Sequence, residues 1–332
     1  MQAVFVARAI KKFLRLFRAH PAVLLVLALT IALPQVSRAQ TNYNRIALQR
    51  WYAGNTAAAF SVGSYPTAVA FDGASIWVGN DNVTGTVTKI NVSDGTTTLT
   101  FNLGTPITQL AFDGSNIWAV EPSTNSVAKV RASDGLVLGT FPVGSEPYSV
   151  AFDGTNIWVA NLFGNTVMKL RKDTGAVLGT YPVGSEPYSM AYDGANMWVV
   201  NASSNSVTKL RGSDGANLGT FPVGVEPTGI AFDGSLMWIV NYGSNSVTTL
   251  LASTGAPQYT YTLGTYPYSI AYDGSYMWIT NSGANTVTRI RPAIRGAVTA
   301  MTFPTQSEPT GVAFDGANVW VADLDSATVN KM

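Results

Sequence analysis

Residues Ser145 to Gly184 read SEPYSVAFDGTNIWVANLFGNTVMKLRKDTGAVLGTYPVG, and close copies of this stretch follow one another along the chain. Its tryptophan recurs at intervals of 41, 40, 40, 40, 40 and 42 residues, at Trp77, Trp118, Trp158, Trp198, Trp238, Trp278 and Trp320. An Asp-Gly pair recurs with the same spacing and begins at residues 72, 113, 153, 193, 233, 273 and 315. A repeat of about 40 residues made of β-type segments is typical of a β-propeller blade.

Four segments of the unit favour β-strands because they are rich in β-branched and aromatic residues and are bounded by Gly, Asp, Asn and Pro. They are Pro147 to Phe152, Asn156 to Asn161, Thr166 to Arg171 and Val177 to Val183. The intervening Asp-Gly and Thr-Gly pairs suit hairpin turns, in which glycine adopts a positive φ. Each unit is therefore predicted to be a four-stranded antiparallel meander, with no room for a helix.

The two ends of the repeat predict how the blades close. Such a sheet is apolar on both faces and must stack on its neighbours, with the Trp of the second strand filling the gap. Thr56 to Gly63 matches only the end of the unit, and the last unit stops after its third strand, Ala327 to Lys331. Closed architectures remove unpaired sheet edges. We therefore predict an all-β, seven-bladed β-propeller over residues 56–332, in which the N-terminal strand joins the C-terminal three.

The first 39 residues have the features of an export signal. Basic residues precede the apolar run Ala22 to Leu33, and Ser37 to Ala39 supplies small residues suited to a signal peptidase. We interpret residues 1–39 as a signal peptide of a protein exported to the periplasm or the extracellular space, and residues 40–55 as a linker. A retained membrane anchor is the alternative, although the apolar run is shorter than the roughly 20 residues that span a bilayer.

Composition narrows the class of partner and of chemistry. The leader holds six of the 20 Lys and Arg and none of the 19 Asp and Glu, so residues 40–332 carry a formal charge of −5. This mild acidity, without a basic block, argues against nucleic acid as a partner. The chain has no Cys and its one His lies in the leader, so a thiol nucleophile, a Ser-His-Asp relay and a soft-metal cluster are not expected. The Asp residues of the Asp-Gly pairs stand alone at hairpins, which favours turn formation over calcium binding.

The pattern Pro-x-x-Val/Ile/Met-Ala-Phe/Tyr-Asp-Gly followed by Ile/Met-Trp-Val-x-Asn resembles the YVTN-type seven-bladed β-propellers of exported bacterial and archaeal proteins. It is seen in Trp158 to Asn161, Trp198 to Asn201 and Trp278 to Asn281. The repeat is also similar in type to that of the streptogramin (virginiamycin B) lyases, for which the resemblance implies catalysis by histidine, a carboxylate and magnesium. Because His20 lies in the leader, the histidine part of that site has no counterpart in residues 40–332.

The resemblance implies that two sets of loops surround one mouth of the central channel, where ligands commonly bind: those from the fourth strand into the next blade and those from the second strand to the third. Loops that vary on a rigid scaffold usually carry function. Most blades have one Asn at the start of the second-to-third strand loop and another four residues later, which we expect to bond local backbone. Glu121 and Asp323 depart from this pattern. The predicted binding surface is acidic and aromatic, and comprises Glu146, Glu186, Glu226, Glu308, Glu121, Asp323, Tyr148, Tyr188, Tyr268 and Phe163.

Carboxylates beside aromatic faces suit sugars, cationic peptides or a weakly held divalent cation in the channel, and a merely solvated rim is the alternative. Otherwise no cofactor is expected. Basic residues recur near the end of the third strand, where we expect solvated stripes that discourage edge pairing: Lys129, Arg131, Lys169, Arg171, Lys209, Arg211, Arg289 and Arg291.

Two functional hypotheses follow from this pattern. The first is a non-catalytic, monomeric exported scaffold that binds protein, peptide, glycan or the cell envelope through the loop face. The second is a metal-dependent lyase or hydrolase related to the streptogramin lyases, which would use carboxylates at the channel mouth. A superfold carries many activities, so the repeat alone does not choose between them.

Overall fold

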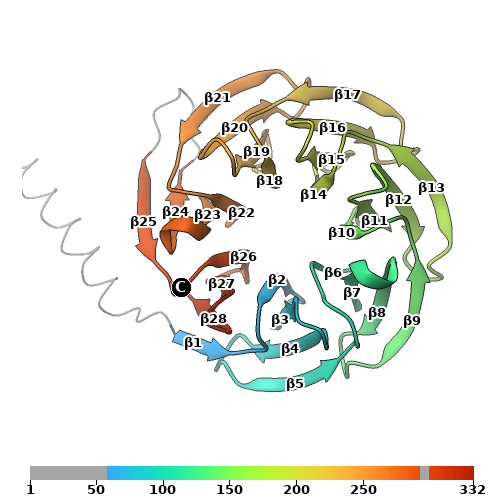
Figure 1. Ribbon diagram of the computed structural model, residues 1–332, viewed down its shortest axis with the longest axis vertical. Coiled ribbons are helices and arrows are strands. Elements are labelled where there is room, and N and C mark those ends of the chain that lie inside the picture. Colours follow the sequence, from blue (N-terminus) through green and yellow to red (C-terminus); the bar gives the residue numbers. More distant parts are fainter. Residues whose placement is uncertain (1–57, 292–298) are drawn as a thin grey trace, which may run out of the picture. The chain divides into compact units, whose positions relative to one another are not determined.

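The computed structural model describes residues 58–291 and 299–332, which form seven four-stranded antiparallel sheets arranged in a ring (Figure 1). In six of the sheets the strands follow one another in sequence, from an inner strand beside the central axis to an outer one, and in the seventh the N-terminal strand is the outer one. The all-β, seven-bladed propeller predicted from the repeat is confirmed. The predicted leader and linker lie outside the described residues.

The blades are numbered in chain order. Blades one and two comprise β2 (Pro66–Phe71), β3 (Ser75–Asn80), β4 (Thr86–Asn91), β5 (Thr97–Asn102), β6 (Leu110–Phe112), β7 (Asn116–Glu121), β8 (Ser126–Arg131) and β9 (Val137–Pro142). Blades three and four comprise β10 (Pro147–Phe152), β11 (Asn156–Asn161), β12 (Thr166–Arg171), β13 (Val177–Pro182), β14 (Pro187–Tyr192), β15 (Asn196–Asn201), β16 (Ser206–Arg211) and β17 (Asn217–Pro222). In blade three all four strands match the predicted segments, except that the last ends one residue earlier.

Blades five and six comprise β18 (Pro227–Phe232), β19 (Leu236–Asn241), β20 (Ser246–Leu251), β21 (Pro257–Thr262), β22 (Pro267–Tyr272), β23 (Met277–Asn281), β24 (Thr286–Ile290) and β25 (Ala300–Pro304). Blade seven comprises β26 (Pro309–Phe314), β27 (Val319–Asp323), β28 (Thr328–Lys331) and the N-terminal β1 (Ala58–Ser61). Two single-turn 3-10 helices, η1 (Pro122–Thr124) and η2 (Ser282–Ala284), lie in second-to-third strand loops.

The ring closes by pairing the two ends of the described chain. β1 runs antiparallel to β28, with Ala58 opposite Lys331 and Ser61 opposite Thr328. Phe60 packs on Trp320 at a ring-centroid distance of 5.5 Å, so β1 also contributes to the core of blade seven. The predicted one-plus-three seam is confirmed.

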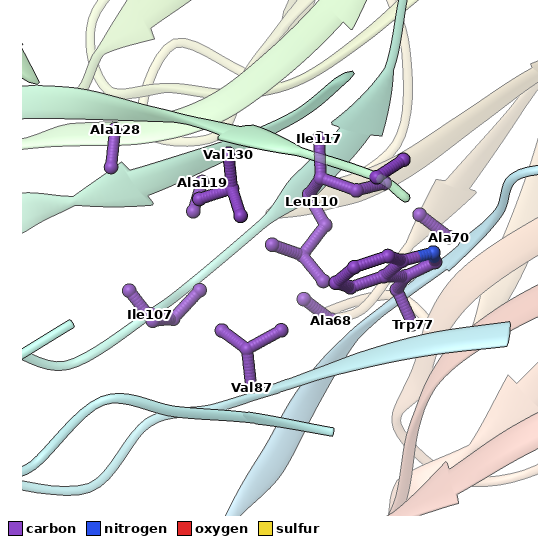
Figure 2. Close-up of a cluster of buried hydrophobic side chains, with 11 residues drawn as sticks. Ala68, Ala70, Trp77, Val87, Ile107, Leu110, Ile117, Ala119, Ala128 and Val130 are labelled. Atoms are coloured by element: carbon purple, nitrogen blue, oxygen red, sulfur yellow. The ribbon is translucent and has the colours of Figure 1, made fainter. Parts of the chain in front are cut away.

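The hydrophobic core lies between neighbouring blades. Figure 2 shows Trp77 and Val87 of blade one facing Ile107, Leu110 and Ile117 of blade two. The same arrangement recurs around the ring, where the Trp of each blade packs against the first and second strands of the next. Because truncation of a buried Trp typically costs about 3–5 kcal/mol, these contacts fix the orientation of each blade.

The Asp of each Asp-Gly pair closes the predicted turn and also holds the Trp. In blade three, Asp153 Oδ1 accepts hydrogen bonds from the backbone N–H groups of Thr155 and Asn156, and Oδ2 accepts one from Trp158 Nε1 at 2.7 Å. The indole N–H of every repeat Trp makes this bond. Burial disfavours ionisation, but the indole and amide donors outweigh it and lower the pKa of four of these carboxyls, Asp72, Asp113, Asp193 and Asp315.

The predicted solvated basic stripes are wrong for the lysines. Lys169 is 5% exposed and pairs directly opposite Trp158, with Nζ 4.9 Å from the ring centroid. Its Nζ donates to the carbonyl oxygens of Gly212 and Ser213 in the next blade. Lys129 and Lys209 are placed in the same way. Lys169 lies within its strand, under the neighbouring blade, whereas the arginine two residues later, at the end of the strand, is exposed.

Deletion of Ala58 to Ser61 is predicted to destabilise the ring strongly. It removes the outer strand of blade seven and the contact of Phe60 with Trp320. Phe60 is half-buried, so loss of its contact should cost somewhat less than the roughly 3–5 kcal/mol of a fully buried aromatic, and the outer-strand hydrogen bonds of β1 are lost with it. Each kcal/mol lowers the melting temperature by about 2–4 °C, so we expect a decrease of about 5 °C or more. Deletion of residues 40–55 is the control in differential scanning calorimetry. Equal melting temperatures for the two truncations would show that the pairing of β1 with β28 does not stabilise the ring.

The two basic residues of β12 should differ sharply in their contribution to stability. Lys169→Met removes a buried ammonium that donates to two carbonyls of blade four, and hydrogen bonds of charged groups contribute about 1.5–3 kcal/mol. Arg171→Met changes an exposed side chain, so its effect should stay within about 0.5 kcal/mol. Urea unfolding measures both variants, and equal free energies of unfolding would show that Lys169 does not join the blades.

Candidate functional site

The loops that enter each first strand, together with the loops between second and third strands, form one end of the ring, here called the loop face. In every blade except the second, the entering loop places a non-glycine residue in the left-handed region, with φ between 48° and 57°. These residues are Tyr65, Glu146, Glu186, Glu226, Tyr266 and Glu308. A left-handed non-glycine residue costs about 1–3 kcal/mol and persists only where its surroundings impose it.

Hydrogen bonds from two loops impose this conformation. The backbone N–H of Glu146 donates to Asn125 Oδ1 of the preceding blade at 2.7 Å, and its carbonyl accepts the N–H of Leu162 at 2.8 Å. Asn165, Asn205, Asn245 and Asn285 bind the entering loops of blades four to seven in the same way. The expectation that these Asn side chains bond only local backbone is therefore wrong, because they tie one blade to the entry of the next. The loop face is a fixed surface.

Glu121 and Asp323 lie beneath this surface, 4% and 0% exposed, at positions where other blades have a buried Asn. Glu121 Oε2 accepts a hydrogen bond from Ser126 Oγ at 2.7 Å, and Asp323 Oδ2 accepts one from Asn330 Nδ2 at 2.5 Å. Burial raises the pKa of both carboxyls, that of Asp323 to about 7. The structure does not bring these two acids to the exposed rim.

Tyr148, Tyr188 and Tyr268 converge in the central channel and are here called the tyrosine cluster. They come from the same position of β10, β14 and β22, in blades three, four and six. Their hydroxyl oxygens are 2.6 Å apart for Tyr148 and Tyr188, 2.6 Å for Tyr188 and Tyr268, and 3.2 Å for Tyr148 and Tyr268. Three hydroxyl groups in a triangle can each donate one hydrogen bond and accept another, so the cluster satisfies itself across the channel.

The other four blades have Thr at this position, and its hydroxyl bonds instead to the neighbouring inner strand. Thr108 Oγ1 donates to the carbonyl of Tyr148 at 3.0 Å, and Thr228 Oγ1 donates to that of Tyr268 at 2.8 Å. Thr67 and Thr310 make corresponding bonds. Because the Thr side chains are small and bond to the neighbouring strand, they leave space in the channel for the three Tyr rings.

The tyrosine cluster continues outward to the rim through Tyr242 and Tyr266, here called the rim pair. Tyr242 stacks on Tyr266 with ring centroids 4.9 Å apart and an interplanar angle of 19°. Its ring also meets Tyr268 edge-on at 6.4 Å, and Tyr268 meets Tyr188 edge-on at 6.2 Å. Tyr266 is 46% exposed, so a continuous series of aromatic contacts runs from solvent to the channel axis.

Tyr242 and Asp81 were not among the residues predicted for the site. They occupy the same place in different blades, directly after the buried Asn of the second strand. Across the blades this position reads Asp81, Pro122, Leu162, Ala202, Tyr242, Ser282 and Leu324. The residue at this position varies more among the blades than its neighbours do, and this variation is the sequence feature that could have identified Tyr242 and Asp81. Tyr242 contacts Tyr268, and Asp81 adds a small contribution to the raised pKa of Tyr268, which burial and then the neighbouring Tyr148 chiefly raise.

Carboxylates lie near the rim pair. Burial raises the pKa of Tyr242, and Tyr266, Glu308 and Glu226 raise it further. Glu226 is exposed and Glu308 is half-buried, and both belong to entering loops that flank the loop of Tyr266. Glu146 and Glu186 occupy the same loop position in blades three and four, and Phe163, 60% exposed, lies in the loop between β11 and β12. The structure therefore groups two of the predicted acids with an aromatic pair.

The channel holds a cavity of about 190 Å³ beside the tyrosine cluster. Hydroxyl and amide groups line it together with aliphatic side chains, among them Thr67, Gln109, Ser189, Thr228 and Ser269. No three His, Cys, Asp or Glu side chains within residues 58–291 and 299–332 gather closely enough to hold a metal ion. The residues present do not fit the histidine, carboxylate and magnesium centre that the resemblance to the lyases implied.

Comparisons with known proteins establish the fold. No protein-family model matches the chain, and no curated protein matches it. Among solved structures, a streptogramin B lyase is 23% identical, with a TM-score of 0.70 over 83% of this chain and 96% of the lyase chain. The hydrazine synthase of Kuenenia stuttgartiensis is 17% identical, with a TM-score of 0.70 over 82% of this chain and 96% of that one.

A functionally unknown protein from Desulfotomaculum acetoxidans is 14% identical, with a TM-score of 0.63 over 72% of this chain and 86% of that one. At these identities the similarity is one of fold. The seven-bladed propeller and its likeness in fold to a streptogramin lyase, both predicted from the repeat, are confirmed.

The tyrosine cluster predicts how stability depends on alkaline pH. Burial first, and the neighbouring tyrosines second, raise the pKa of Tyr188 and Tyr268 well above 10.0. Groups whose pKa is higher in the folded state contribute fully below the unfolded pKa and lose that contribution as the pH rises through the folded pKa. Stability should therefore fall above about pH 10, by about 1.4 kcal/mol per pH unit for each group.

The measurement is urea unfolding between pH 8 and 12, paired with the ultraviolet absorbance of tyrosinate. The Tyr188→Phe, Tyr268→Phe double variant keeps the rings and should lose the part of the alkaline slope that these two hydroxyls contribute, while other tyrosines with a raised pKa, such as Tyr242, keep theirs. A folded protein whose double variant shows the same slope and the same tyrosinate titration as the parent would contradict the burial of these hydroxyls.

Proposed function

We propose that the chain is a non-catalytic, exported propeller that acts as a monomer and binds a macromolecular ligand at its loop face. The rim pair carries this proposal, because an exposed, stacked tyrosine surface continues as aromatic contacts down to the channel axis. Aromatic rings on a fixed scaffold give large contact area at low entropic cost, which favours binding. The clamped entering loops supply that scaffold.

The remaining features of the molecule are compatible with this role. The basic run, apolar run and small residues of 1–39 support export. In the described part of the chain, no helix is long and apolar enough to cross a membrane. The loop face carries carboxylates, which argues against nucleic acid as the ligand.

Binding should depend on Tyr266. We expect an array of bacterial envelope glycans and peptides to contain ligands whose affinity falls about two- to tenfold in Tyr266→Ala, because stacking of an aromatic ring contributes about 0.5–1.5 kcal/mol. Tyr65→Ala is the matched control, since Tyr65 has the equivalent place in blade one, a φ of 57° against 50°, and an exposed fraction of 53% against 46%. Equal effects of both variants on every ligand would refute a site at the rim pair.

A catalytic role predicts a different result. Incubation of the protein with a streptogramin B and Mg²⁺ tests the alternative suggested by the fold similarity. We expect the antibiotic to remain unchanged, because no cluster of metal-binding side chains is found among the described residues. Turnover that disappears on chelation would overturn the non-catalytic proposal.

A further inference from the structure

Charge is segregated between the two ends of the propeller. No Lys or Arg of the described residues lies in the loops of the loop face. They lie instead on the third strands or in the loops at the opposite end, at Lys89, Lys129, Arg131, Lys169, Arg171, Lys172, Lys209, Arg211, Arg289, Arg291 and Lys331. The loop face carries only negative side-chain charge, at Asp81, Glu121, Glu146, Glu186, Glu226, Glu308, Asp323 and Asp325.

Part of this charge lies beside the rim pair. The backbone carbonyl of Glu226 accepts the N–H of Tyr242 at 2.9 Å, and the entering loops of Glu226 and Glu308 flank that of Tyr266. Asp81, which is exposed, occupies the position of Tyr242 in blade one. These acids come from blades five, seven and one, whereas Glu121 and Asp323 are buried and cannot meet a ligand. A flat aromatic surface flanked by carboxylates matches a guanidinium or ammonium group, which stacks on a ring and bonds to carboxylates.

Several repeat tryptophans have a lysine ammonium group over the ring. Lys169 lies 4.9 Å from the ring centre of Trp158, and Lys89 and Lys209 lie 4.9 Å from those of Trp77 and Trp198. These rings receive a cation from their own chain. No Lys or Arg of the described loop-face residues stacks on the rim pair, and Tyr266 is 46% exposed, so its ring is accessible to a cation of a ligand.

We infer that the loop face binds a basic polypeptide segment, with an Arg or Lys side chain stacked on Tyr266 beside Glu226 and Glu308. This inference rests on the proposed function of the loop face as a binding surface and assigns its partner. A peptide can place further basic residues over Glu146, Glu186 and Asp81 around the same mouth. Its binding would be driven by charge complementarity across a face of a single sign.

The test uses hexa-arginine as the probe, with hexa-glutamine and hexa-glutamate as neutral and anionic counterparts, in isothermal titration calorimetry at low and moderate salt. Of the three peptides, we expect only hexa-arginine to bind. Its affinity should fall as the NaCl concentration is raised, because salt screens exposed charges. Tyr266→Ala, Glu226→Gln and Glu308→Gln should each weaken binding about two- to fivefold, as expected for exposed cation contacts of about 0.5–1 kcal/mol.

Asp173→Asn is the matched control, because it removes an exposed carboxylate from the opposite end of the ring and should leave the affinity unchanged. Circular dichroism and thermal melting confirm that each variant is folded. If Asp173→Asn weakens binding as much as Glu226→Gln, the attraction is one of net charge and the assignment to the loop face fails.

The outcomes also separate this inference from the proposal on which it rests. If hexa-glutamine or a neutral envelope glycan binds with dependence on Tyr266 while hexa-arginine does not, the basic partner is refuted and the binding surface stands. If hexa-arginine does not bind and no array ligand depends on Tyr266, both are refuted. Salt-sensitive binding of hexa-arginine that is lost in the three loop-face variants supports both.

Discussion

The contact between each Trp and the next blade is the interaction on which the rest of the structure depends. The Asp of the Asp-Gly turn holds the indole from its N–H edge, and in several blades a Lys covers its face and reaches carbonyls of the following blade. The indole ring is therefore oriented by a hydrogen bond at its edge, by a cation over one face and by the apolar side chains of the next blade. The contact of a Trp with the next blade recurs around the ring of seven sheets, so one interaction joins neighbouring blades throughout.

A closed ring converts a position in the repeat into a place around the axis. Tyr148, Tyr188 and Tyr268 are 40 and 80 residues apart in sequence, but they share one register and so meet in the channel. The alternative residue at that position, Thr, is short enough to bond the backbone of the neighbouring inner strand. The choice between Thr and Tyr thus decides, blade by blade, whether a side chain strengthens the ring or fills the channel.

The fold and the position of the mouth could be predicted because both follow from the period and from strand direction. Burial at single positions could not. Glu121 and Asp323 stand where Asn161 is fully buried between two loops, and only the packed loops show that an acid there is hidden rather than displayed. The alternation that placed Lys169 and Arg171 on one face was correct, but the neighbouring blade covers the first and not the second. Tyr242 could not be predicted because its position follows the consensus Asn and has no residue type common to the blades, so only the contact with Tyr266 shows its role.

The architecture also explains why an acidic loop face can exist on a chain with many basic residues. The lysines opposite the repeat Trp rings are required between blades, and their ammonium groups reach carbonyls near the Asp-Gly end of the ring. Positive charge is thereby used to join blades, and it is confined to the half of the molecule in which those carbonyls lie. The loops at the other end have no such structural need for Lys or Arg. Near-identical repeats can therefore present a loop face whose charged side chains are all acidic. Replacement of the consensus residues by Tyr242 and Tyr266 then makes the part of that face in blades five and six aromatic.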